Sequence, residues 1–88
     1  MVRQPLTPEQ LAAGKRLGSL LRAARADQPL DGIAHAAGIS PETLRKIETG
    51  RLPTPAFGAV VQLAATLDLD LNDVAAAWRE EAKIGAAS

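Results

Sequence analysis

The chain has 88 residues, the size of one small domain, and we expect a single domain over 1–88 with its core at about 7–78 and a flexible tail at 84–88. Cysteine is absent and histidine occurs once, which excludes a disulfide framework and disfavours a metal site, so we expect no metal and no cofactor. The formal net charge is zero, but residues 1–53 carry eight Lys and Arg against five acids and residues 54–88 carry two against five, an asymmetry that suits one face turned toward an anion.

The first predicted helix begins after Thr7. Thr7 is a good N-cap, Pro8 suits the first helical position, and Gln10 can close a capping box onto Thr7. Apolar residues at helical spacing then form one stripe: Leu17, Leu20, Leu21 and Ala24. Gly14 and Gly18 lie one turn apart and lower the helix propensity, so we expect them to permit close contact with another segment.

Two short helices follow. Pro29 ends the first helix, because the residue before a proline disfavours helical geometry, and the second helix is expected over about residues 30–37. Gly38 supplies the left-handed residue that stops it. Ser40, an N-cap followed by proline, begins the third helix, which we expect to end at Gly50.

Capping residues also predict the start of the last two helices. Thr54 and Pro55 repeat the cap-and-proline signal for a fourth helix, and Asp70 caps a fifth, with Asp73 in its first turn. The expected buried stripe of the fourth helix is Phe57, Val60, Val61, Ala64 and Leu67. The apolar side of the fifth is Leu71, Val74, Ala75 and Trp78. No segment alternates like a strand, so the fold class is all-α.

The stretch IAHAAGISPETLRKIETGR, residues 33–51, joins the second and third helices through a tight turn, with Ile39 placed to fill the core between them. It resembles the phage repressor/Cro family of helix-turn-helix DNA-binding domains, and residues 55–75 continue the resemblance as that family's fourth and fifth helices. The resemblance implies a compact five-helix domain whose second and third helices form the helix-turn-helix. It also implies double-stranded DNA as the partner.

In this family the third helix lies in the major groove, with its N-terminal residues at the base edges. Leu44 and Ile47, three residues apart, mark the inward side of that helix. The positions expected to contact bases are Glu42, Thr43, Arg45 and Lys46. Those expected to contact the DNA backbone are Ser40, Thr49 and Arg51, joined on charge alone by Lys15, Arg16 and Arg3. On any other helix, two adjacent cations such as Arg45 and Lys46 would be ordinary solvated residues.

The two acids of the third helix have different expected roles. Glu48 matches a family position that pairs with an arginine near the end of the first helix, which makes Arg25 its natural partner and Arg22 the second choice. Glu42 points outward and has two interpretations: it accepts from a cytosine amino group, or it pairs with Lys46 four residues later.

A departure from the family pattern bears on affinity. Pro29-Leu30 stands where the family often has a Ser/Thr-Gln pair that contacts a phosphate and the third helix. Pro41 likewise removes a side-chain donor at the start of the third helix. We therefore expect a leaner set of DNA contacts.

The family often dimerises through the C-terminal end of the domain, so the expected dimer interface is Val74, Trp78 and Ile84. The alternative for Trp78 is a lid that folds back on the core. A two-fold dimer would read half-sites about one helical turn apart on a pseudo-palindrome.

The expected function is a sequence-specific transcriptional regulator and not an enzyme, since we find no catalytic constellation. No leader peptide or membrane-spanning run is recognisable, so a cytoplasmic location and no membrane partner are expected. The alternative is a protein-interaction module, or an antitoxin-like partner protein, on the same scaffold. Near-zero net charge and the acidic rear favour this alternative.

Overall fold

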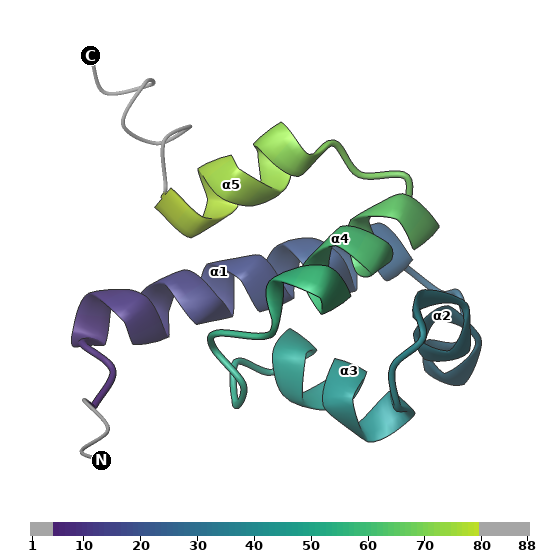
Figure 1. Cartoon of the computed structure of the whole chain (residues 1–88), viewed down its shortest axis with the longest axis horizontal. Coiled ribbons are helices and arrows are strands. Elements are labelled where there is room, and N and C mark those ends of the chain that lie inside the picture. The colour runs from purple at the N-terminus through teal and green to yellow at the C-terminus, as the bar shows by residue number, and fades with distance from the viewer. Residues whose placement is uncertain (1–4, 80–88) are drawn as a thin grey trace.

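The computed structural model describes residues 5–79, which form an all-α domain without a strand in that range. Its helices are α1 (Pro8–Arg25), α2 (Leu30–Ala37), α3 (Pro41–Glu48), α4 (Phe57–Thr66) and α5 (Leu71–Arg79). The five-helix fold class expected from the sequence is confirmed (Figure 1).

Most helix ends form as their local signals predict. The backbone N–H of Gln10 donates to Thr7 Oγ1 at 3.1 Å, and the N–H of Thr7 donates to Gln10 Oε1 at 2.8 Å, which completes the capping box of α1. Ser40 Oγ accepts from the N–H of Thr43 at 3.1 Å at the start of α3. Asp70 Oδ1 accepts from the N–H of Asn72 at 2.8 Å at the start of α5.

The start of α4 differs from the prediction. The helix begins at Phe57, its N-cap is Ala56, and no side chain caps it. Thr54 and Pro55 belong to the connection instead, because the chain is still extended at Ala56, where ψ is 142°. This connection carries Pro53 against α1, where the Pro53 ring lies so close to Gly14 that a Cβ there would overlap it.

The buried side of α4 also differs from the predicted stripe. Leu63 and Ala64 are the residues of this helix that are buried, and Leu63, which the prediction omitted, is fully inaccessible. Phe57 is 77% exposed, because it lies in the first turn, at the end of α4 that forms the wall of a surface groove. Membership of an apolar stripe therefore does not guarantee burial at a helix end.

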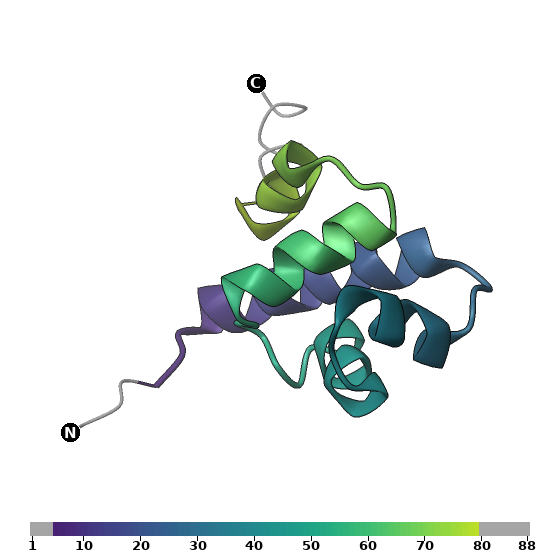
Figure 2. The ribbon, with the colours of Figure 1, turned by 45° about the vertical axis from the view of Figure 1, so that its right-hand side comes forward.

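The long helix α1 lies between α3 and α5 and contacts both of them. Figures 1 and 2 show α5 on one side of α1 and α3 on the other, with α2 beside α3 and α4. The core formed between them contains Leu17, Leu21, Ile33, Ala34, Ala37, Leu44, Ile47, Leu63, Ala64 and Val74. This packing fixes α3 against the rest of the domain through its inner side and leaves its outer side to solvent.

Gly18 lies at a close approach between α1 and α3. A Cβ at this position would overlap the carbonyl oxygen of Ile47 and lie 2.8 Å from that of Glu48. The expectation that this glycine permits close contact with another segment is confirmed. The absence of a side chain on α1 thus sets the depth at which α3 docks.

Candidate nucleic-acid interface

The turn between α2 and α3 is built from Gly38 and Ile39. Gly38 adopts φ 77°, the left-handed conformation in which a residue with a side chain is strained. Its N–H donates to His35 O at 3.1 Å, and the N–H of Ile39 donates to Ala34 O at 3.0 Å, so two carbonyls in the last turn of α2 are satisfied. Ile39 is half-buried against the core. The turn is held both by hydrogen bonds and by packing, which fixes the angle at which α3 leaves it.

The two sides of α3 have opposite character. Leu44 and Ile47 are fully buried on the inner side, as the spacing predicted. On the outer side, polar residues line a shallow hollow of about 280 Å³: Glu42, Arg45, Lys46, Thr49 and Arg51. The structure therefore brings together three of the four residues predicted to contact bases and two of those predicted to contact the DNA backbone.

Arg25 and Glu48 form a bidentate ion pair that joins α1 to α3. Arg25 Nε donates to Glu48 Oε2 at 2.7 Å, and Arg25 Nη2 donates to Glu48 Oε1 at 3.0 Å. The side chains are only 12% and 6% exposed, and these hydrogen bonds raise the pKa of Arg25 above its usual value. Arg25 Nη1 also donates to Gln28 O at 2.7 Å. Glu48 thus neutralises an arginine of α1 and is kept away from the outer side of α3.

Glu42 and Lys46 form a looser pair on the outer side, with Nζ and Oε2 3.6 Å apart. The Glu42 side chain is 75% exposed, so this pair contributes little to stability. The pairing matches one of the two interpretations of Glu42 and leaves the carboxylate accessible to a base.

Arg45 lies exposed next to this pair. Among residues 5–79, no hydrogen bond or ion pair engages its guanidinium. A guanidinium presents a fork of donors that suits the N7 and O6 acceptors of guanine. Arg45 is the residue of α3 best placed to use that fork on a ligand.

The hydroxyl groups of Thr43 in α3 and of its two caps, Ser40 and Thr49, make hydrogen bonds within this segment. Ser40 Oγ lies 2.8 Å from Thr43 Oγ1 and caps the helix through the N–H of Thr43. Thr49 Oγ1 donates to Arg45 O at 2.9 Å. A phosphate contact from the Thr49 hydroxyl would require this bond to break, so the cations of the hollow are the stronger candidates for anion contacts.

The structure gives Arg16 a different place from the predicted phosphate contact. Its guanidinium is partly buried, with Nε donating to Ala77 O at 2.8 Å and Nη2 donating to Trp78 O at 2.6 Å. These carbonyls lie in the last described turn of α5, where a cation is favoured by the helix dipole. Arg16 is therefore a structural clamp between α1 and α5.

Lys15, the neighbour of Arg16 in the sequence, faces the end of α3 and not α5. It is exposed, and its side chain lies beside Gly50, since a Cβ on Gly50 would be 2.8 Å from Lys15 Cγ. Gly50 directly precedes Arg51, which lines the hollow. Lys15 and Arg51 thus lie near the C-terminal end of α3, where both could meet the same DNA strand.

Two of the three predicted dimer residues, Val74 and Trp78, lie in the part of the chain that the structure describes, and both line one groove. Val74 is buried in the core, Trp78 is half-buried against it, and Ile84 lies outside the described residues, as does Arg3. The groove is apolar, sequence reasoning missed it, and the exposed side chains of Phe57 and Leu71 line it as well. No sequence signal identifies this groove, because Leu17 of α1 and the lining residues between 54 and 79 meet only in the folded domain.

The part of the chain that the structure describes contains neither a metal-binding cluster nor a membrane-spanning helix. Within residues 5–79 there is no group of three or more His, Cys, Asp or Glu side chains that could hold a metal ion. None of the helices in that range is long and apolar enough to cross a membrane.

Comparison with known proteins agrees with the geometry. A family model described as a helix-turn-helix domain matches residues 16–77, which is most of the chain and spans α2, the turn and α3. A search of curated proteins finds no match.

Proposed function

The chain belongs to the helix-turn-helix domain family, and from that premise we propose that it is a sequence-specific transcriptional regulator that binds double-stranded DNA as a homodimer on a pseudo-palindromic operator. It acts in the cytoplasm as a binding protein and has no enzymatic activity. The observation that carries the proposal is the outer side of α3, where Arg45, Lys46 and Arg51 share one hollow while the inner acid, Glu48, is neutralised by Arg25.

In the proposed complex the outer side of α3 enters the major groove. Arg45 reads a guanine through its N7 and O6 atoms, and Lys46, kept close by Glu42, reaches an adjacent base edge. Arg51 and Lys15 contact phosphates at the C-terminal end of α3. The contacts to phosphates are few, so the sequence-independent part of the affinity is small.

We expect DNA affinity to fall with salt at a moderate slope. If Arg51 and Lys15 each neutralise one phosphate in each copy of a dimer, the slope of log affinity against log salt is about −3 to −4. Fluorescence anisotropy on a duplex selected from a random-sequence pool measures it. Arg51→Ala should make the slope shallower by about two per dimer. If no selected duplex showed salt-dependent binding, the proposal that the protein binds DNA would be wrong.

Arg45→Ala should weaken specific binding by about 1–2 kcal/mol per half-site and relax the preference at one base position. The loss is expected because the guanidinium is the only group of Arg45 that could hydrogen-bond to the base. The change should leave the fold intact because the side chain is exposed. Repeating the selection with the variant shows whether one position of the motif becomes degenerate. Arg22→Ala is the matched control: it removes the same charge from α1, where the guanidinium donates to Ala26 O outside the hollow. Equal effects of the two changes would refute the role of Arg45.

The second candidate function is a protein-interaction module or antitoxin-like partner protein on the same scaffold. It is favoured by the apolar groove beside Trp78 and by the zero formal net charge. The two functions separate in one experiment: a stoichiometric protein partner that is lost in Trp78→Ala, combined with no DNA binding, supports the second.

A further inference from the structure

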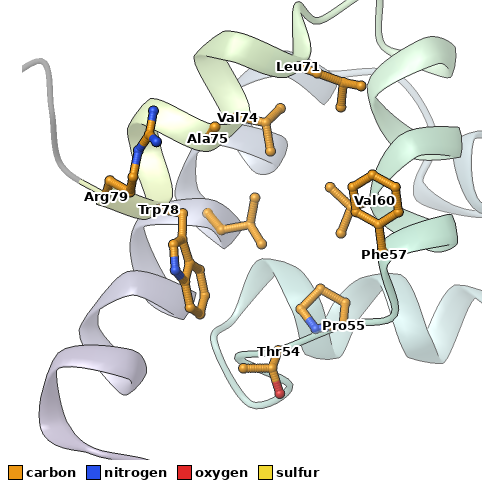
Figure 3. Close-up of a pocket in the computed structure, with 10 residues that line it drawn as sticks. Thr54, Pro55, Phe57, Val60, Leu71, Val74, Ala75, Trp78 and Arg79 are labelled. Atoms are coloured by element: carbon orange, nitrogen blue, oxygen red, sulfur yellow. The ribbon is translucent and has the colours of Figure 1, made fainter.

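An apolar groove of about 570 Å³ opens between α1, α5 and the N-terminal end of α4. Its floor contains Leu17 of the core, and Figure 3 shows Trp78 and Phe57 on opposite sides of it. In the same view Leu71 and Pro55 lie at the two edges between those rings. Because side chains surround the groove, its shape suits a compact molecule better than an extended segment, which would need two open ends.

The chemistry of the groove favours an uncharged occupant. Of the described residues that line it, only Arg79 is charged, and Arg79 already makes an interaction of its own. The chain carries no charged residue between Arg51 and Asp68, the segment that contributes the α4 side. A charged molecule would lose hydration in this groove without gaining a partner, which costs free energy.

The groove is held open by the fold. On the α5 side, the guanidinium of Arg16 binds the carbonyls of Ala77 and Trp78. On the α4 side, Pro53 is buried against Gly14, and the connection continues from there to the groove. Both walls are tied to α1, so the groove exists before anything binds, and little ordering is required on association.

We propose that the groove binds one small, uncharged, apolar molecule between the rings of Trp78 and Phe57. Small-molecule sites are mostly apolar, largely pre-formed and about 300–1,000 Å³ in volume, and this groove fits that description. Ten residues line it, whereas a standard protein interface uses about 20–30 on each side. The size therefore matches a ligand and not a protein surface. The ligand would cover Phe57, which is 77% exposed.

The ligand and DNA would use different sides of α1. Figures 1 and 2 show α5 on one side of this helix and α3 on the other. A molecule in the groove touches Leu17 and leaves the outer side of α3 uncovered. The proposal therefore does not depend on the DNA function. It also gives Val74 and Trp78 a role different from the dimer interface expected for them.

Titration with N-phenyl-1-naphthylamine, an uncharged apolar fluorophore, tests the proposal. At low micromolar protein the probe should bind saturably, one molecule per chain, and should quench the emission of Trp78, the only tryptophan. Phe57→Ser should raise the dissociation constant of the probe about tenfold, because one wall of the site is lost. Its circular dichroism melt should be unchanged, since the side chain is exposed. Leu11→Ser is the matched control: Leu11 is 44% exposed, does not line the groove and should bind the probe like the wild type.

Ala75→Phe separates a defined site from general adsorption to an apolar surface. Ala75 lines the groove and is half-buried, so the added ring would fill the groove while making the surface more apolar. Probe affinity should fall at least about tenfold. Tighter binding would show general adsorption and would overturn the proposal. If this variant does not fold, Phe57→Ser decides alone.

Other occupants of the groove give distinct results, and each would overturn the proposal. Weaker probe binding at a hundredfold higher protein concentration would show that a second copy covers the groove. Tighter binding in Ile84→Ser would show that residues 80–88 already occupy it. A stoichiometric protein partner that displaces the probe would assign the groove to that partner. Equal dissociation constants in the wild type and Phe57→Ser would place the probe elsewhere on the protein.

Discussion

Gly18→Ala should destabilise the domain by about 2–3 kcal/mol, although alanine is the better helix former by nearly 1 kcal/mol. The added Cβ would overlap the carbonyl oxygen of Ile47 and lie within 3 Å of that of Glu48, and backbone atoms cannot rotate away. Helix α3 must therefore move off α1, which also opens the core around Ile47. Urea denaturation monitored by circular dichroism measures the free energy of unfolding.

Gly58→Ala is the control for this change, and its expected sign is opposite. Gly58 lies in α4, is exposed, and would place a Cβ in open space. The same added methyl group should stabilise the domain by up to about 1 kcal/mol, through lower chain entropy in the unfolded state. If Gly18→Ala were also stabilising, the close contact between α1 and α3 would have to be abandoned.

Glu48→Ala should cost about 3 kcal/mol, the low end of the range for breaking a buried ion pair. The change leaves the Arg25 guanidinium, 12% exposed, without the carboxylate that accepts two of its hydrogen bonds. The bond from Nη1 to Gln28 O remains, which moderates the loss. Glu42→Ala removes the same charge and chain length from the exposed side of α3, where the pair with Lys46 is 3.6 Å long, and should change stability by less than about 0.5 kcal/mol.

A double-mutant cycle separates the ion pair from the cost of an orphaned charge. The cycle consists of Arg25→Met, Glu48→Leu and the double variant. The double variant should recover at least half of the stability lost in Glu48→Leu, because no buried charge is then left unpaired. DNA binding should weaken in Glu48→Ala, since α3 loses its polar link to α1. Additive effects of the two single changes would show that the residues do not interact in solution.

Local signals in the sequence were sufficient for most helix ends. The Thr7 capping box and the Ser40 cap involve residues three positions apart, so the sequence contains both partners of each bond. Gly38 stops α2 for an equally local reason, its positive φ. The start of α4 was predicted wrongly from an equally local signal at Thr54, because the path of the chain past α1 carries residues 54–56 through an extended connection.

The candidate site was predictable where one helix supplies it. The spacing of Leu44 and Ile47 on α3 leaves Glu42, Arg45 and Lys46 on the other side, and the structure places these three in one hollow. The partner of Glu48 came from the family resemblance, and the structure contains that pair. What each exposed residue binds is left to the experiments above.

The neighbours Lys15 and Arg16 show that the sequence does not reveal which tertiary contacts a side chain makes. Lys15 and Arg16 carry the same charge and were assigned the same role, but Lys15 lies beside Gly50 and Arg16 binds the end of α5, 61 positions away. Successive helical residues point about 100° apart, so each faces whatever helix packs on its side. Phe57, which was expected to be buried, is exposed, and Leu63, which the predicted stripe left out, is buried, since burial depends on which neighbours are present. The sequence by itself determined the helices, apart from the start of α4, the turn and the exposed outer side of α3, because these depend on contacts within a few residues. Only the tertiary structure decided the Arg16 clamp, the depth at which α3 docks and the groove beside Trp78, because each is formed by segments that meet only when the core packs.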